Sequence, residues 1–261
     1  MAKVYGILFL ILLVCVGCEW QLRSTHDAAD DVEIKIERYD RIESLYLTTS
    51  DYSALQQMNT IYPMQTRMLL ENVLLIGKVN DPEINTKFLH FFQDSVLQTM
   101  LHDVQEQYAD IDDLNDELTV AFRRLKEELP DLEIPQIYAQ IGSFDQSIIV
   151  GNNTLGISLD KYLGADYPFY QEHYTENQRR MMVREMIVPD CLSFYLLSLY
   201  PMPHADELAQ EQRDMHMGRI QWVVNQITDQ KIFDNSFVSK AEEAMKHNKQ
   251  MTIRQLLLQS E

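Results

Sequence analysis

The chain has 261 residues, of which 40 are Asp or Glu and 22 are Lys or Arg, so that its net charge at pH 7 is −18. A surface this acidic repels phosphate backbones and anionic lipid headgroups, which argues against nucleic acid as a partner and against electrostatic adsorption to a membrane. With three cysteines in all, a framework of disulfide bonds is also excluded.

The first 17 residues have the layout of a bacterial secretory signal. Lys3 precedes an apolar run over residues 4–17, which is shorter than the roughly 20 residues that span a bilayer. The run ends in the sequence CVGC at 15–18, which resembles a lipobox except that Cys15 stands where Leu is usual. We therefore expect cleavage before Cys18 and a diacylglycerol thioether on its sulfur. The alternatives are an ordinary signal peptide and an uncleaved anchor.

Residues 19–31 are polar and show no apolar period, which predicts a short tether between the lipid and a folded body. A lipid with two acyl chains anchors stably where one chain does not, so the lipid alone would hold the protein at the membrane. The predicted organisation is a signal peptide (1–17), a lipidated tether (18–31) and a single domain (32–261). The expected location is the cell envelope, on the periplasmic or surface face of the outer membrane.

The body is predicted to begin with a strand, because apolar and polar residues alternate over residues 32–38. Residues 39–62 are mixed in character and are predicted to form a loop with one short helix. A helix is expected over residues 65–76, ended by Gly77.

Two longer helices are predicted next. Asp81-Pro82-Glu83 provides an N-cap, a proline at the first helical position and an acid in the first turn, for a helix that lasts to about Tyr108. Asp110 is predicted to cap a second helix, in which apolar residues recur every three or four positions over residues 111–129. Pro130 ends it.

Over residues 134–160 the period changes to two, which predicts three short strands. The strands are expected over residues 137–141, 147–150 and 155–159, and Gly151-Asn152-Asn153 is a turn signal between the last two. We predict a three-stranded antiparallel meander, with the last strand at its edge.

The remainder is predicted to be helical. A capping box at residues 175–178 indicates a helix from Glu176, which Pro189 kinks or interrupts. Two further helices are expected near residues 218–230 and 239–258. The predicted fold class is therefore α+β, mainly helical with a small antiparallel meander.

This order of elements resembles the N-terminal lobe of zinc peptidases of the zincin type, whose helix bears H-E-x-x-H with two imidazole ligands and a glutamate general base. If Glu185 is aligned with that glutamate, the ligand positions hold Arg184 and Val188. Neither side chain binds zinc, and the fixed charge of arginine disfavours a nearby divalent cation. These three positions are predicted to be vestiges of an active site, in a protein with no catalytic residue, metal or cofactor.

The other candidate catalytic or metal-binding residues form no recognisable site. The histidines nearest to the predicted site are His173, His204 and His216. His204 with Asp206 and Glu207 forms a tempting cluster, but the spacing matches no known set of metal ligands. Cys191 lies in an apolar stretch and is predicted to be a small buried hydrophobe. A zinc metallopeptidase with a non-standard ligand set remains the alternative.

Three blocks of sequence, residues 134–138, 149–164 and 180–190, together resemble the GldB family of gliding-motility-associated lipoproteins of Bacteroidota. The resemblance extends loosely over residues 32–225. It implies an inactive relative of zincin peptidases with a non-enzymatic role in the envelope. In gliding members of the phylum it further implies association with the motility and secretion apparatus.

Three functions follow from these patterns. The first is a non-catalytic envelope lipoprotein that binds an envelope protein or peptide through the former peptidase cleft, by strand addition to residues 154–160. The candidate contact residues are Thr154, Ser158, Asp160 and Lys161. The second is the metallopeptidase with an unrecognised ligand set, and the third is a purely structural lipoprotein.

Overall fold

The computed structural model describes residues 32–259. The expected signal peptide, the tether and Cys18 therefore lie outside the described residues. Within residues 32–259, no helix combines the length and the apolar character needed to span a bilayer.

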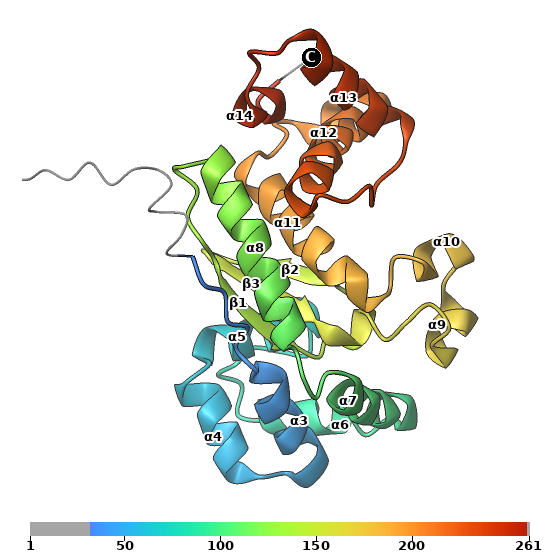
Figure 1. Ribbon diagram of the computed structural model, residues 1–261. Coiled ribbons are helices and arrows are strands. Elements are labelled where there is room, and N and C mark those ends of the chain that lie inside the picture. Colours follow the sequence, from blue (N-terminus) through green and yellow to red (C-terminus); the bar gives the residue numbers. More distant parts are fainter. Residues whose placement is uncertain (1–31, 260–261) are drawn as a thin grey trace, which may run out of the picture.

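A small three-stranded sheet lies at the centre of the fold, with helices on both of its faces (Figure 1). Its strands are β1 (Gln136–Gln140), β2 (Ile148–Val150) and β3 (Thr154–Ser158). Four of the five residues of β1 and four of the five of β3 are buried, so both faces of these strands are covered. The predicted fold class, α+β and mainly helical with a small sheet, is confirmed.

The predicted antiparallel meander is wrong, because the sheet is mixed. Its order is β1-β3-β2, with β1 parallel and β2 antiparallel to β3. The loop after β1 is held at the end of β3 by Asp160, whose carboxylate accepts the N–H groups of Gly142 (2.6 Å) and Phe144 (2.5 Å). This loop carries the chain past β3, so that β3 occupies the middle of the sheet and not its edge. The hairpin from β2 to β3 forms as predicted.

The helices before the sheet form the lower part of the molecule in Figure 1, and α8 runs across the sheet. They are α3 (Tyr39–Thr49), α4 (Tyr52–Thr60), α5 (Pro63–Met68), the π-helical turn η1 (Leu69–Val73), α6 (Ile84–Phe91), α7 (Ser95–Gln107) and α8 (Asp112–Glu128).

The segment over residues 32–38 is extended, but it is not the predicted strand. Its apolar residues are buried in alternation, as the pattern predicted. Its backbone, however, bonds to side chains of α8: the N–H of Ile34 donates to Thr119 Oγ1 (2.9 Å) and that of Ile36 to Asn115 Oδ1 (2.8 Å). A single parallel bridge connects the segment to β1. Alternating burial therefore arose without a sheet ladder.

Residues 39–62 form two helices where a loop with one short helix was predicted. The inner face of α3 carries Asp40, Glu43 and Ser44, all buried, so α3 shows no apolar stripe in the sequence. The predicted helix from residue 81 to 108 is also divided. Asp94 caps a new helix by accepting the N–H groups of Val96 and Leu97, which separates α7 from α6.

The elements after the sheet are η2 (Leu159–Lys161), α9 (Pro168–His173), α10 (Glu176–Arg179), η3 (Arg184–Met186), α11 (Ile187–Leu199), η4 (Ala205–Glu207), α12 (Gln210–Thr228), α13 (Ser236–His247) and α14 (Ile253–Leu257). The capping box at Thr175 is present, but α10 has only four residues. Pro189 lies in the first turn of α11, where a proline is tolerated, and does not interrupt it.

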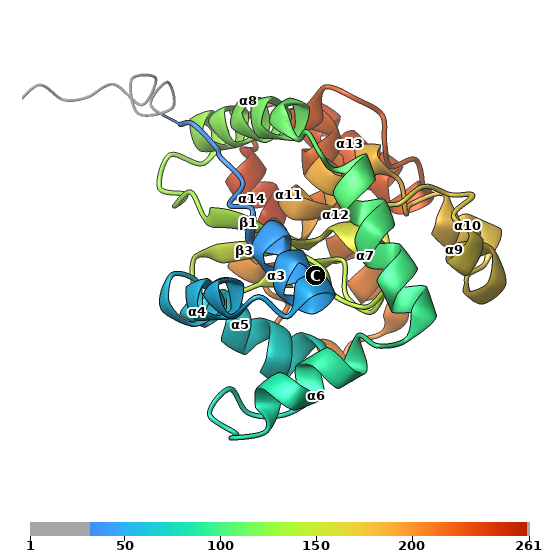
Figure 2. The same cartoon turned by 90° about the horizontal axis from the view of Figure 1, so that it is seen from below.

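Helix packing sets the position of the site. α3 packs on β1, whereas α11 packs on β2 and β3 and also contacts α8 and α12. Figure 2, seen from below, shows α3 and α11 on different sides of the sheet. The helices α12, α13 and α14 gather at the other end of the molecule from α3–α6 (Figure 1). The end of α12 thereby approaches the space between α8 and α11.

Candidate functional site

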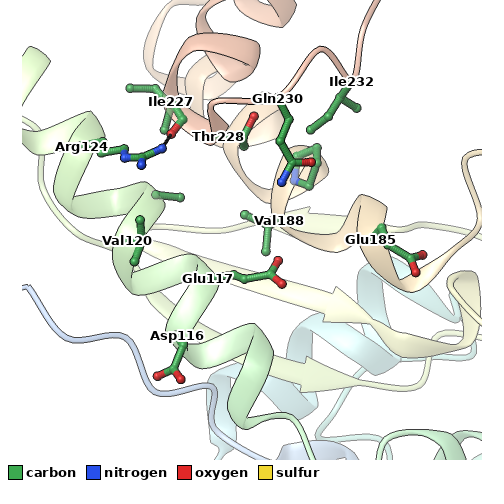
Figure 3. Close-up of a pocket in the computed structure, with 12 residues that line it drawn as sticks. Asp116, Glu117, Val120, Arg124, Glu185, Val188, Ile227, Thr228, Gln230 and Ile232 are labelled. Atoms are coloured by element: carbon green, nitrogen blue, oxygen red, sulfur yellow. Dashed lines mark hydrogen bonds between the residues drawn. The ribbon is translucent and has the colours of Figure 1, made fainter.

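An open cleft of about 390 Å³ lies between α8, the start of α11 and the end of α12 (Figure 3). Its lining residues are Asp116, Glu117, Val120, Ala121, Arg124, Glu185, Val188, Pro189, Ile227, Thr228, Gln230 and Ile232. We refer to this space as the α8–α11 cleft. It combines acidic side chains with an apolar wall.

The helical period of α8 explains its contribution. Leu114, Leu118 and Phe122 point into the core, and the residues between them face outward. Glu117 and Val120 are three positions apart and therefore share one face, which borders the cleft. Val120 is 47% exposed, so its aliphatic side chain is available for contact from the cleft.

The acids of the cleft have no cationic partner. Asp116, Glu117 and Glu185 form no hydrogen bond or ion pair with the part of the chain that the structure describes. Partial burial raises the pKa of Glu117, and repulsion from Asp113 and Glu185 adds to this rise, whereas the charge of Arg184 opposes it. Figure 3 shows Glu117 pointing from α8 toward Val188 on α11.

The one arginine that lines the cleft is already engaged. Arg124 Nη1 donates to the carbonyl oxygen of Ile227 (2.9 Å), which ties α8 to the end of α12 (Figure 3). Arg124 therefore closes the upper part of the cleft and forms no ion pair with the three acids.

The predicted vestigial triplet is split between two roles. Glu185 and Val188 line the cleft, whereas Arg184 does not. Arg184 Nη2 and Nε donate to the two carboxylate oxygens of Asp113 (2.6 and 3.0 Å), and Nη2 also donates to the carbonyl of Asp110 (2.9 Å). Its guanidinium lies 4.8 Å from the ring centroid of Tyr108. Arg184 thus fastens the start of α11 to the turn between α7 and α8.

The local backbone also differs from that of a zinc-binding helix. Arg184 and Glu185 belong to the 3₁₀ turn η3, and α11 begins only at Ile187. Among residues 32–259, no group of three or more His, Cys, Asp and Glu side chains is arranged to hold a metal ion. The resemblance to zincin peptidases stays a prediction.

The candidate histidines do not converge. His216 is buried, and its Nε2 lies 2.8 Å from the carbonyl oxygen of Tyr200. His173 is exposed and stacks on Phe169, with ring centroids 4.1 Å apart. His204 is exposed in a turn beside Glu207. Cys191 is buried, and burial raises the pKa of its thiol.

The four candidate contact residues of the third strand lie outside the α8–α11 cleft. Ser158 and Asp160 are fully buried, and Thr154 and Lys161 are partly exposed. Lys161 Nζ donates to the carbonyl of Phe144 (2.9 Å), so Lys161 supports the loop after β1. Because β3 is central, it has no free edge for strand addition, and that expected binding mode is wrong.

Asp190 is a partly buried acid that the sequence analysis overlooked. It accepts a hydrogen bond from the hydroxyl of Tyr162 (2.8 Å) at the start of α11. Burial raises the pKa of Asp190 to about 6. An acid between Pro189 and Cys191 in an apolar run was the signal that could have identified it.

The fold and the cleft define a mainly helical α+β protein with an open, acid-lined groove. A family model described as gliding motility protein GldB matches residues 21–252, so the chain belongs to the GldB family. The resemblance predicted from the three sequence blocks is confirmed. The family is one of cell-envelope lipoproteins related to gliding motility. No curated protein and no solved structure matches the chain.

Replacement of Arg184 tests whether this residue holds the start of α11 to the turn between α7 and α8. Arg184→Ala removes a paired guanidinium, and we expect the free energy of unfolding to fall by about 1–2 kcal/mol, since charged hydrogen bonds contribute but solvent screens this half-exposed pair. Denaturant unfolding measures the change. Arg180→Ala, which removes an exposed pair with Glu176, is the control and should be nearly neutral. Equal stabilities of the two variants would contradict the assignment.

Asp190→Asn tests the partly buried acid. The folded-state pKa of about 6 exceeds the unfolded value near 4, so Asp190 adds stability below about pH 4 that is lost as the pH rises through 6. Asparagine still accepts from Tyr162, and we expect it to stabilise the fold by about 2 kcal/mol at pH 7. Thermal unfolding from pH 4 to 8 measures this, with the exposed Asp206→Asn as control. A gain that does not vary with pH would refute the explanation.

Proposed function

We propose that the protein is a non-catalytic lipoprotein of the cell envelope that binds a protein partner through the α8–α11 cleft. Family membership supports the envelope location and the link to gliding motility. The observation that carries the binding role is the charge of the cleft: three acids against one arginine, beside an apolar wall. A cation supplied by a partner would complete this arrangement.

The partner we propose presents a lysine or arginine next to aliphatic side chains, within an envelope protein or peptide. The aliphatic part would pack on Val120, Val188 and Ile232, and the cation would lie between Glu117 and Glu185. Partial burial and repulsion from Asp113 and Glu185 make the ionised form of Glu117 costly and raise its pKa, although Arg184 offsets part of this cost. A bound cation would remove that cost, so complementarity of charge favours this partner over an acidic one.

Side-chain insertion into the cleft replaces strand addition as the proposed mode of binding. The outer edge of β1 is bridged by Glu37, which exchanges hydrogen bonds with the backbone of Ile137 and Ala139. The other edge, β2, has three residues, and Ile148 and Ile149 are each only 6% exposed. A cleft lined by side chains is more accessible than either edge.

The non-catalytic part of the proposal depends on the two positions beside Glu185. Position 188 holds an aliphatic side chain in the cleft wall. Position 184 holds an arginine that has a structural role, with its guanidinium turned toward Asp113. Glu185 therefore has no neighbouring metal ligand or base at these positions and acts by its charge.

The proposed attachment is a lipid on Cys18 after removal of residues 1–17, on the outer membrane. Replacing Cys18 by Ala should move the protein from the membrane fraction to the supernatant after ultracentrifugation, because the lipid is the anchor. Cys15→Ala is the matched control and should stay with the membrane. A Cys18→Ala protein that still sediments with the membrane would refute lipid anchoring at this residue.

The binding role is tested with two pools of short aliphatic peptides, one containing lysine and the other acetyl-lysine at the same position. We expect the full-length protein to bind the lysine pool at least about tenfold more tightly, which corresponds to about 1.4 kcal/mol. The double variant Glu117→Gln/Glu185→Gln should lose the preference for the lysine pool, and added salt should weaken this preference in the unmodified protein. Fluorescence anisotropy measures the affinities.

The control for this test neutralises two exposed acids outside the cleft, Asp145→Asn and Glu243→Gln. It should retain the preference for lysine, since the overall change in charge is the same. Equal binding of both pools by the unmodified protein would contradict a cation-binding cleft and favour a purely structural lipoprotein.

A further inference from the structure

A second group of acids lies outside the cleft, fully buried where α3 packs on the sheet. Asp40 and Glu43 come from α3 and Asp160 follows β3, and none of the three is exposed to solvent. The other titratable groups facing Glu43 are Tyr39 on the same helix and Tyr138 on β1. All five groups are neutral or negative, so no cation faces Glu43 directly.

The other elements packed on α3 add no charge near Glu43. The only titratable residue of α4 is Tyr52, which is 77% exposed. From α7, Gln105 reaches Asp40 (3.5 Å), and from α5, Thr66 accepts the hydroxyl of Tyr39 (3.3 Å). The environment of Glu43 is thus polar but without a positive side chain.

Two of the three acids are well supplied with donors. Asp40 accepts two hydrogen bonds from the guanidinium of Arg38 (2.8 and 2.7 Å). Asp160 accepts two backbone N–H groups, as described above. Glu43 accepts only one, from the N–H of Ile141 to Oε2 (3.0 Å), and its Oε1 has no partner among the described residues.

A second buried oxygen without a donor lies in the same interface. Gln140 donates from Nε2 to Ser158 Oγ (3.3 Å), but its Oε1 has no partner in the described chain. A buried acceptor without a donor costs about 1–3 kcal/mol, so two of them in one interface call for an explanation.

The register of α3 on β1 places Glu43 beside the end of β1 that carries Gln140. Tyr39 and Tyr138 are in edge-to-face contact, with ring centroids 6.3 Å apart. Glu43 lies about one helical turn beyond Tyr39, and Gln140 lies two residues beyond Tyr138 on the same face of β1. One turn of α3 and two residues of β1 each advance the chain by roughly 6 Å. The hydrogen bond from Ile141 to Glu43 confirms that the helix and strand keep this register.

We propose that Glu43 is a neutral carboxylic acid in the folded protein and that its Oε1–H donates to Gln140 Oε1. One proton then satisfies both orphaned oxygens and joins α3 to the sheet. Burial raises the pKa of Glu43 well above its usual value, and the charges of Asp160 and Asp40 raise it further. Burial also raises the pKa of Asp160, but the N–H groups of Gly142 and Phe144 oppose that rise, so the proton belongs to Glu43.

The proton stabilises the packing of α3, and with it the N-terminal segment, on the sheet. The chain passes from residues 32–38 into α3, whose contact with β1 includes this hydrogen bond. Loss of the proton would leave a carboxylate beside Asp40, Asp160 and the Gln140 oxygen, all of which repel it. Raising the pH should therefore weaken the attachment of α3 to the sheet.

Glu43→Gln tests the proposed hydrogen bond, because its amide can donate to Gln140 and still accept from Ile141. Between the unfolded and folded pKa values of Glu43, the unfolded chain is ionised and the folded chain is not. The unfolding equilibrium constant of the unmodified protein, divided by that of Glu43→Gln, should then rise about tenfold per pH unit above the unfolded-state pKa, until the raised folded-state pKa is reached. Both proteins retain Asp190, so its titration cancels in the ratio.

The measurement uses the purified full-length protein, with the exposed Glu128→Gln as control, for which the ratio should stay constant over the same range. Infrared spectra at pH 7 should show a protonated carboxyl band that Glu43→Gln lacks. A ratio for Glu43→Gln that does not change with pH would overturn the proposal. So would a loss of stability on chelation that is confined to the unmodified protein, because a metal ion would then be the partner of Glu43.

Discussion

The contact between Arg184 and Asp113 determines where α11 starts relative to α8, and the cleft is the space that this contact leaves between the two helices. The guanidinium binds the carboxylate of Asp113 in α8 and the backbone carbonyl of Asp110 in the α7–α8 turn, and it covers the ring of Tyr108. Glu185, the next residue, is thereby carried to the cleft wall opposite Glu117. Arg184 thus has a specific structural task, which is to fix the start of α11 against α8.

The small sheet needs polar groups as well as apolar ones in its surroundings. Carboxylates organise the segments around it: the buried Asp160 holds the loop after β1, and the partly buried Asp190 accepts a hydrogen bond from Tyr162 at the start of α11. Each acid is placed where backbone N–H or hydroxyl groups would otherwise lack a partner. The resulting interior is rich in carboxyl groups, which accords with the acidic composition of the whole chain.

Much of the fold could be predicted from local patterns. The amphipathic period of α8, the hairpin turn at Gly151 and the capping box at Thr175 are signals contained within a few residues, and all three appear in the structure. Three sequence blocks also sufficed to predict the family. Strand order was not predictable in this way, because alternation identifies a strand but not its neighbours.

Two of the errors arise from polar side chains that pack against the core. α3 was missed because Asp40 and Glu43 occupy its inner face, and residues 32–38 resembled a strand because side chains of α8 replace a partner strand. For the site, the sequence identified Glu185 and Val188 but could not reveal Glu117 and Val120. These lie 68 residues earlier and meet them only through the packing of α8 on α11.

The most direct test of the cleft as a binding site is photo-crosslinking in the native envelope, with a photoreactive residue in place of Val120. Leu45 on α3 is the matched control, since it is 44% exposed against 47% for Val120. The account predicts one dominant adduct from position 120 that is absent from position 45, to an envelope protein whose captured segment carries a lysine or arginine. Equal labelling from both positions, or a captured segment without a basic residue, would contradict it.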